Sequence, residues 1–174
     1  IFSLINYRLY YYLTIPIYIF NILLLLLVDV FGKTAMGSQR WLSIGGFNLQ
    51  PSELSKITTI LISTKIFSQD RKLNFIKILF TLVLVFINAF LIYKQPDLGS
   101  SILVISLFFF IGLNSGAKKI YFLILIIFGL AFLPFGFKNL KEYQKKTLLV
   151  FLNPNIDPLG AGYTVIQSKI AIGS

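Results

Sequence analysis

Long apolar runs separated by short polar segments are the main pattern along this chain. A helix needs about 20 predominantly apolar residues to cross a hydrocarbon core of about 30 Å. The runs lie at about residues 10–31, 53–67, 75–93, 99–113 and 120–137. They predict an all-α fold: a polytopic transmembrane helix bundle of about five spans in a single integral membrane domain, followed by a large outer loop over 138–174.

Composition and charge narrow the class of protein. Only 13% of the 174 residues are charged and 56% are hydrophobic, whereas soluble domains carry about 25% charged residues. The chain has no Cys and no His, which excludes a disulfide scaffold, a Cys/His zinc site and a Ser-His-Asp catalytic site. Because the basic residues lie between apolar runs, we expect membrane lipids, and no nucleic acid, among the partners.

The basic residues of the loops give an orientation. If the spans alternate, one side of the membrane holds Arg8, Lys65, Arg71, Lys72, Lys77, Lys118 and Lys119. The short loops on the other side hold Lys33, Arg40 and Lys94. The positive-inside rule places the richer side in the cytoplasm, so the segments 32–52, 94–97 and 138 onward are predicted to face outward.

The segment after the fifth run conflicts with this rule, because it is basic on the side where cations should be sparse. Its lysines are Lys138, Lys141, Lys145 and Lys146. Segments far from a helix end can escape the rule, or the number of spans is off by one. Alternatively, these lysines meet an anion outside the membrane, such as a phosphate. The spacing alone leaves these interpretations open.

Glu53 and Lys56 are three residues apart, so they share one face if the second run is helical. The sequence Gln50-Pro51-Ser52-Glu53 is typical of a helix start and puts Glu53 in the first turn, where the helix dipole favours an anion. A charge within a span costs roughly 2.5–3.5 kcal/mol, so Lys56 needs a counter-charge or a cavity. It forms a structural ion pair with Glu53, or it lines a hydrophilic cavity open to the outer face.

The third and fourth runs are separated by Lys94-Gln95-Pro96-Asp97-Leu98-Gly99, which leaves almost no loop. Pro96 removes a backbone donor and Gly99 permits unusual backbone angles, so a tight turn is predicted. Asp97 is expected to cap the following helix through the amide of Gly99 or Ser100.

The segment 37–47 is predicted to be an extracytoplasmic interfacial loop. The side chains expected to lie in the interface are Trp41, Leu42, Ile44 and Phe47. Gln39 and Arg40 are expected to face water or headgroups. With a second cationic segment, such as the lysines near Tyr143, the same loop would form half of a phosphate site.

Asp157 lies in a segment, 153–163, that has two prolines and two glycines and cannot be helical throughout. Residues 164–172 after it could start another helix. A carboxylate in an outer loop near several lysines is a candidate base or metal ligand. An Asp-Pro pair is also typical of a plain turn.

Three segments together resemble the SEDS family of peptidoglycan polymerases. They are GSQRWL (37–42) leading to QPSELSK (50–56), then QPDLG (95–99), then DPLGAGY (157–163) with QSKIAIGS (167–174). Each is unusual in composition, and their order and spacing match the family. The last stretch, with Leu159 and SKI at 168–170, looks more like the family's elongation branch than its division branch.

The resemblance implies a multi-pass protein of the bacterial cytoplasmic (inner) membrane whose active site lies on the extracytoplasmic side. The resemblance implies a fold of about ten transmembrane helices. This chain is similar to the middle of that fold, from the end of the second helix to the outer loop after the seventh. We therefore expect it to be a piece of a longer protein and to be inactive alone.

The activity that the resemblance implies is glycosyl transfer: lipid II is polymerised through β-1,4 bonds for cell elongation and rod shape, and undecaprenyl pyrophosphate leaves. Asp157 matches the family's catalytic aspartate and would accept the proton of the attacking hydroxyl. The groups expected to bind the pyrophosphate are Gln39, Arg40, Lys56, Lys145 and Lys146. A divalent cation, Mg²⁺ or Mn²⁺, could share this task, and no organic cofactor is expected.

Glu142 lies just outside the fifth run. We expect it, rather than Glu53, to be the main counter-charge of Lys56.

The partners implied by the resemblance are lipid II, the undecaprenyl-pyrophosphate-linked glycan, a class B penicillin-binding protein and other membrane proteins of the elongation complex. Two alternative functions use the same features. A lipid II flippase would need the intramembrane charges but no outer base, and a scaffold for a penicillin-binding protein would need neither.

Overall fold

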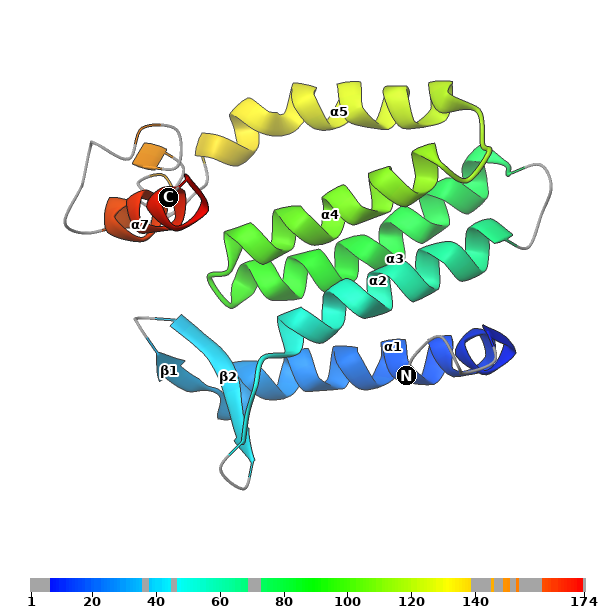
Figure 1. Ribbon diagram of the computed structural model, residues 1–174. Helices are drawn as coiled ribbons and strands as arrows, with labels where there is room; N and C mark the ends of the chain where they lie inside the picture. Colours follow the sequence, from blue (N-terminus) through cyan, green and yellow to red (C-terminus); the bar gives the residue numbers. More distant parts are fainter. Residues whose placement is uncertain are drawn as a thin grey trace. The chain divides into compact units, whose positions relative to one another are not determined.

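The computed structural model of the chain describes residues 7–35, 38–44, 47–68, 73–138, 145, 149, 150, 153 and 161–173 (Figure 1). The helices are α1 (Tyr7–Phe31), α2 (Pro51–Ser68), α3 (Phe75–Lys94), α4 (Leu98–Leu113), α5 (Lys119–Lys138) and α7 (Ala161–Gly173). The strands are β1 (Lys33–Ala35), β2 (Ser38–Ile44) and β3 (Phe47–Leu49). The chain divides into two compact units, Ile1–Leu125 and Ile126–Ser174, and α5 crosses the boundary.

Each of the five predicted apolar runs is a helix, α1 to α5, so the all-α prediction is confirmed. Among the described residues, Arg8–Phe31 of α1 and Phe75–Lys94 of α3 are long and apolar enough to cross a membrane. The apolar helices Leu98–Leu113 and Lys119–Ala131 are shorter. Part of the predicted outer loop is also helical, since α7 covers Ala161–Gly173.

Within the first unit, α2 is the central helix. It contacts α1, α3 and α4, and α3 also packs along α4 (Figure 1). The connections from α2 to α3 and from α3 to α4 are short, and consecutive helices of this unit run antiparallel. One end of this bundle, which we call the sheet end, holds the last turn of α1, the strands, the first turn of α2 and the turn between α3 and α4. The opposite end holds the start of α1, the end of α2 and the start of α3.

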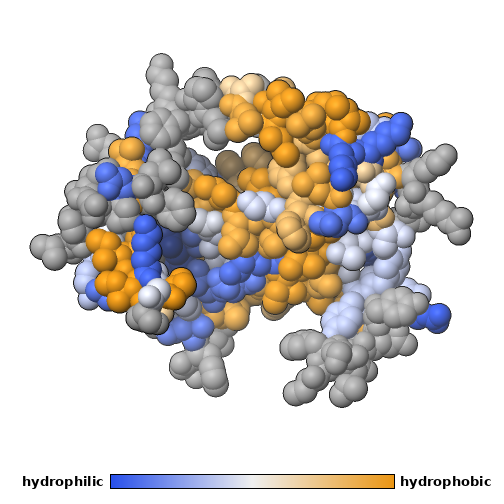
Figure 2. Space-filling model, turned by 45° about the horizontal axis from the view of Figure 1, so that its top comes forward, coloured by the Kyte–Doolittle hydropathy of each residue, from blue (hydrophilic) through white to orange (hydrophobic). Residues whose placement is uncertain are grey.

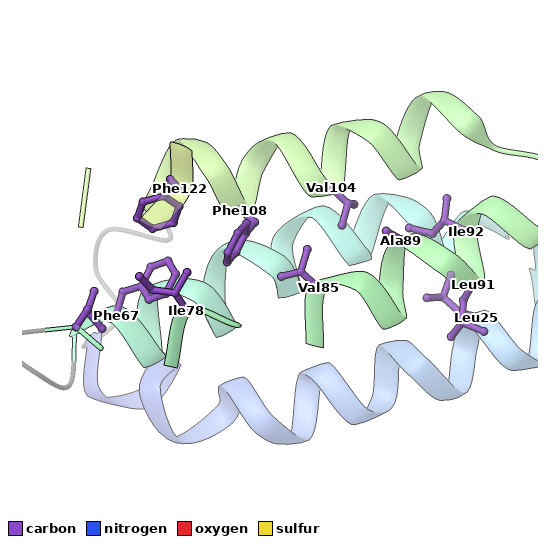
Figure 3. Close-up of a cluster of buried hydrophobic side chains, with 11 residues drawn as sticks. Leu25, Phe67, Ile78, Val85, Ala89, Leu91, Ile92, Val104, Phe108 and Phe122 are labelled. Atoms are coloured by element: carbon purple, nitrogen blue, oxygen red, sulfur yellow. The ribbon is translucent and has the colours of Figure 1, made fainter. Parts of the chain in front are cut away.

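The core of the first unit is a continuous apolar cluster between these helices. Figure 3 shows it running from Phe122, Phe108 and Phe67 at one end to Leu91, Ile92 and Leu25 at the other. The aromatic rings pack with centroids 5.9 Å apart for Phe67 and Phe108 and 6.1 Å apart for Phe108 and Phe122. These spacings are typical of favourable aromatic pairs, which add about 0.5–1.5 kcal/mol beyond area burial.

Gly112 of α4 makes the aromatic end of this core possible. A Cβ atom at this position would overlap the Phe122 ring, so only a residue without a side chain lets α5 start so close to α4. Cores already packed at high density tolerate such added volume poorly.

Many apolar side chains of α1, α3 and α5 point away from this core. Examples are Leu23 at 53% exposed, Phe80 at 57% and Ile124 at 49%. In Figure 2 the middle of the visible face is mainly apolar. Exposed apolar surface on this scale marks an interaction surface, and for helices of this length the matching surroundings are lipid chains.

The segment predicted to be an irregular interfacial loop is instead a three-stranded antiparallel sheet with the order β1-β2-β3. Leu42 pairs with Leu49 and Ile44 with Phe47, and β1 joins β2 with a register shift between Lys33 and Thr34.

Two side chains of β2 join this sheet to the bundle. Leu42 is buried against Leu24, Val28 and Leu54. Arg40 is the extra residue of a bulge in β2, because Trp41 pairs with Lys33 and Gln39 with the next residue of β1. The prediction that Leu42 lies in the membrane interface is therefore wrong, and Arg40 keeps 31% of its side chain exposed while its guanidinium contacts the turn between α3 and α4.

Candidate functional site

The acidic side chains that the structure describes, Asp29, Glu53 and Asp97, all lie at the sheet end of the bundle. Arg40 and Lys56 lie at the same end, on β2 and in the second turn of α2. This end therefore brings together four of the charged residues that the sequence singled out, and Asp29, which is exposed, adds a fifth charge.

Arg40 binds the turn between α3 and α4. Its Nε donates to the Gln95 carbonyl at 3.3 Å, one Nη donates to the Pro96 carbonyl, and the other lies 3.8 Å from Asp97 Oδ1. The side chain of Asp97 is only 10% exposed and that of Arg40 is 31% exposed. A planar guanidinium with five donors can serve three acceptors at once, which an ammonium does with less fixed geometry.

Asp97 caps α4 as predicted: its Oδ1 accepts from the Ser100 backbone N–H at 3.1 Å. The same oxygen faces Arg40, so one carboxylate satisfies a helix start and a distant cation together. A carboxylate in this position also interacts favourably with the helix dipole. Of the other predicted turn residues, Pro96 directly precedes Asp97, whereas Gly99 lies in the first turn of α4 with ordinary helical angles, so the expectation of unusual backbone angles at Gly99 is wrong.

The same turn is also fixed from α1 and from within the α3–α4 pair. The Gln95 carboxamide, buried in the core, donates to the Leu25 carbonyl at 2.8 Å. Ser101 donates through its hydroxyl to the Ala89 carbonyl at 2.8 Å. Three elements, α1, β2 and α4, thus hold one turn in place.

Lys56 forms an ion pair with Glu53, with 2.5 Å between Nζ and Oε2. The structural ion pair, one of the two sequence interpretations, is thereby present. The expectation that Glu142 rather than Glu53 is the main counter-charge of Lys56 is not met among the described residues, since Glu53 holds that place and Glu142 lies outside them. The two side chains lie on adjacent turns of one helix, so this ion pair forms without any contact between distant parts of the chain.

The Glu53–Lys56 pair is partly open to solvent. The Lys56 side chain is 27% exposed and that of Glu53 is 58% exposed. An ion pair this exposed contributes about 0–1 kcal/mol to stability. The Lys56 ammonium is therefore held in place without being sealed in, so a further anion can still approach it.

The remaining predicted site residues are only partly covered by the structure. Asp157, Lys146 and Glu142 lie outside the described residues. Gln39 is placed in β2 by its backbone. Lys145 is a half-buried helical residue of the second unit.

The described residues do not form a metal site. Where the structure describes the chain, no group of three or more acidic, His or Cys side chains comes together. The Asp97 carboxylate already contacts Arg40 and the Ser100 amide. The Glu53 carboxylate already forms an ion pair with Lys56. A divalent cation held by these residues is therefore not supported, and one that binds at Asp157 stays a prediction outside the described ranges.

A buried polar seam, made of Asn21, Ser55, Thr58 and Asn88, runs from the sheet end into the bundle. The Asn21 Nδ2 donates to Ser55 Oγ at 2.8 Å and lies 3.5 Å from Asn88 Oδ1, and the Asn88 Nδ2 donates to Thr58 Oγ1 at 3.4 Å. All four residues are at most 1% exposed. The sequence interpretation missed the two asparagines, although polar residues inside apolar runs are rare and signal such contacts.

The chain is similar to known peptidoglycan glycosyltransferases. The chain is 41% identical over 160 residues to the peptidoglycan glycosyltransferase MrdB of Escherichia coli (strain K12), covering 91% of this chain and 43% of MrdB. It is 36% identical over 177 residues to a probable peptidoglycan glycosyltransferase FtsW of Geobacter metallireducens, covering 98% of this chain and 46% of that protein. The chain thus spans about half the length of the curated relatives it matches.

A solved structure shows the same fold. It is that of a peptidoglycan synthase complex that coordinates polymerization and crosslinking, and one of its chains superposes with a TM-score of 0.74 at 31% sequence identity. The match covers 98% of this chain and 51% of that one. The family described as cell cycle protein, which groups FtsW, RodA and SpoVE, matches residues 1–174. The resemblance inferred from the three sequence segments is thereby confirmed, and the chain belongs to the FtsW/RodA/SpoVE family, a family of membrane proteins.

Proposed function

We propose that the protein to which this chain belongs is a peptidoglycan glycosyltransferase that polymerises lipid II. The observation that carries the proposal is the 41% identity to a peptidoglycan glycosyltransferase over most of the chain. The names of the relatives favour glycosyl transfer over the flippase and scaffold alternatives. The partly open ammonium of Lys56 at the sheet end supports an anionic substrate there.

The sheet end is the proposed substrate side. The described cations Arg8, Lys65, Lys77, Lys118 and Lys119 lie at the opposite end of the first unit. By the positive-inside rule that end faces the cytoplasm and the sheet end faces outward. The polymerising site therefore lies on the extracytoplasmic side of the bacterial cytoplasmic membrane.

In the proposed reaction, Asp157 accepts the proton of the 4-hydroxyl of the acceptor sugar. The freed oxygen attacks the anomeric carbon of the donor, a β-1,4 bond forms, and the bond to the pyrophosphate breaks. The undecaprenyl pyrophosphate leaves with that electron pair. Lys56, Lys145 and Lys146 neutralise its growing charge, with Gln39 as a further donor.

Arg40 has a different role in this proposal. Its guanidinium is already bound to two carbonyls and a carboxylate of the α3–α4 turn. We assign it to positioning: it holds β2 and the first turn of α4 in a fixed relation.

A transpeptidase partner is part of the proposal. The similar chain of known structure comes from a complex that coordinates polymerization and crosslinking. Since crosslinking is the reaction of a class B penicillin-binding protein, we infer such a partner for this protein within an elongation complex.

The test uses the purified full-length protein and lipid II. Asp157→Asn is expected to reduce glycan-chain formation by about 10²- to 10⁴-fold, the range for loss of a general base. Asp29→Asn, which removes an exposed carboxylate at the same end of the bundle, is the matched control and should polymerise normally. Undiminished polymerisation by Asp157→Asn would refute the role of Asp157, and absence of polymerisation by the wild-type protein under all conditions would refute the enzyme.

A further inference from the structure

A cavity of about 500 Å³ lies between α1 and α2 at the end of the bundle opposite the sheet. Its wall includes Tyr10, Tyr11, Leu61, Thr64, Lys65 and Ser68. A volume of this size is in the range of small-molecule sites, about 300–1,000 Å³. The cavity is far along α2 from Lys56 and has no part in the proposed glycosyl transfer.

Lys65 is held at the wall of this cavity. Its Nζ donates to the Tyr11 carbonyl at 2.8 Å and lies 4.4 Å from the centroid of the Tyr11 ring. An ammonium has three donors, and the carbonyl takes one of them. Lys65 thus presents a fixed positive charge at the cavity rather than a freely moving one.

The surroundings of Lys65 are cationic. Arg8, Lys77, Lys118 and Lys119 lie at the same end of the first unit. In the described part of this unit no acidic side chain lies there, and Asp70 falls in the range 69–72 that is not described. Each basic residue close to an anionic membrane surface contributes about 1 kcal/mol of attraction.

The other residues of the cavity wall match the boundary between the polar headgroup of a lipid and its acyl chains. Thr64 and Ser68 are exposed hydroxyl residues that line the cavity, and the Ser68 hydroxyl donates to the Lys65 carbonyl at 3.1 Å. Tyr10 and Tyr11 are aromatic residues in the first turns of α1, where tyrosines gather at the membrane–water interface. Leu61 lines the cavity, and beyond it Leu13 of α1 and Ile57 and Ile60 of α2 are exposed apolar residues.

We propose that this cavity binds the phosphate headgroup of an anionic glycerophospholipid, with Lys65 as the counter-charge. Thr64 and Ser68 lie beside the phosphate, and the acyl chains lie along the exposed apolar faces of α1 and α2. Grooves with basic residues between membrane helices on the cytoplasmic side are suited to such headgroups. The apolar wall at Leu61 favours a lipid over free phosphate.

A second cavity provides an internal comparison. It measures about 390 Å³, lies between α2 and α4, and shares Thr64 and Ser68 with the first. Its other wall residues include Phe67, Phe110 and Asn114, and none of its described wall residues is basic. Both cavities thus offer hydroxyl groups and enough volume, but only the first has a basic residue in its described wall. We therefore place the headgroup only in the cavity at Lys65.

The experiment measures lipid retention by the full-length protein. The protein is taken from nanodiscs of mixed phosphatidylglycerol and phosphatidylcholine, and the lipids that remain bound are identified by native mass spectrometry. Wild-type protein should retain phosphatidylglycerol in preference. Lys65→Gln should lower that retention about fivefold, in line with the loss of one cation at a membrane surface, and Lys65→Arg should preserve it.

Lys119→Gln is the matched control, because it removes the same charge from an exposed position at the same end that does not line the cavity. Equal losses for Lys65→Gln and Lys119→Gln would overturn the proposal in favour of general surface attraction. Displacement of the lipid by millimolar inorganic phosphate would overturn it in favour of a free-anion site. If Lys65→Gln fails to fold, Leu61→Trp fills the cavity without changing charge and should lower retention equally; full retention by that variant would also overturn the proposal.

Discussion

The two ends of the first unit are made from the same helices but hold their charges in different ways. At the sheet end, two cations are paired with carboxylates, Arg40 with Asp97 and Lys56 with Glu53, while Lys94 lies over the Phe90 ring. At the opposite end, Lys65 is held by a backbone carbonyl and an aromatic ring. An ion pair fixes a geometry, whereas the Lys65 charge, with no described carboxylate beside it, attracts anions from outside the protein.

The contacts at the sheet end also differ in how far apart their partners lie in the sequence. Arg40 reaches residues 55 and 56 positions later in the chain, whereas Glu53 and Lys56 are three positions apart. A long-range contact holds tertiary structure together, while a local pair mainly orients one side chain.

Among variants of the described residues, the largest effect is expected for Lys56→Ala in the full-length protein. Loss of a cation that stabilises a leaving pyrophosphate should lower polymerisation of lipid II by about 100-fold, as for other electrostatic groups in active sites. Lys119→Ala, at the opposite end, should leave the rate unchanged. Equal rates for both variants would show that the charges of the sheet end have no special part in the chemistry.

Arg40→Ala should have the next largest effect, on stability. It removes two hydrogen bonds and leaves the nearly buried Asp97 carboxylate without its cation, at a cost of about 2–3 kcal/mol. The measurement is the thermal melting temperature of the full-length protein in detergent. Arg40→Lys should recover only part of the loss, because an ammonium lacks the planar fork that directs donors at all three acceptors; full recovery would contradict the role of the guanidinium shape.

At the opposite end, Gly112→Ala should destabilise the bundle through added volume rather than charge. The new methyl group would overlap the Phe122 ring, and overpacking of this kind costs about 1–3 kcal/mol. Gly129→Ala on α5, where a Cβ meets nothing within 4 Å, is the matched control. An unchanged melting temperature for Gly112→Ala would show that α5 can move away from α4 at little cost.

The smallest effect on stability is expected for Glu53→Gln. The ion pair with Lys56 is local and partly exposed, so its loss should cost less than about 0.5 kcal/mol. Melting curves of this variant beside those of Arg40→Ala test the ranking directly. A shift as large as that of Arg40→Ala would mean that the local pair is a structural contact in its own right.

The sequence predicted the parts of the molecule that depend on local pattern. The five apolar runs became helices α1 to α5, and Asp97 caps α4, because hydropathy and capping act over a few residues. The sheet was not predicted, since its short strands, two of them only three residues long, give little alternation to detect.

Contacts between distant residues could not be predicted in the same way. Nothing near Arg40 in the sequence indicates that its partners are Gln95 and Pro96. The carboxamides of Asn21 and Asn88 meet only after α1, α2 and α3 have packed. Such pairings are set by the fold as a whole, so they became visible only with the structure.

The polar seam also fixes how far α2 can turn about its own axis. Ser55 and Thr58 bond the carboxamides of α1 and α3, and a rotation of α2 would carry their hydroxyls toward hydrocarbon. At 1.5 Å and 100° per residue, the nine residues from Lys56 to Lys65 span about 14 Å and half a turn beyond two full ones. The two lysines thus project from opposite sides of one helix. A rotation of α2 that turned Lys56 toward a neighbouring helix would therefore turn Lys65 away from it. The seam therefore sets the angular position of both cations at once.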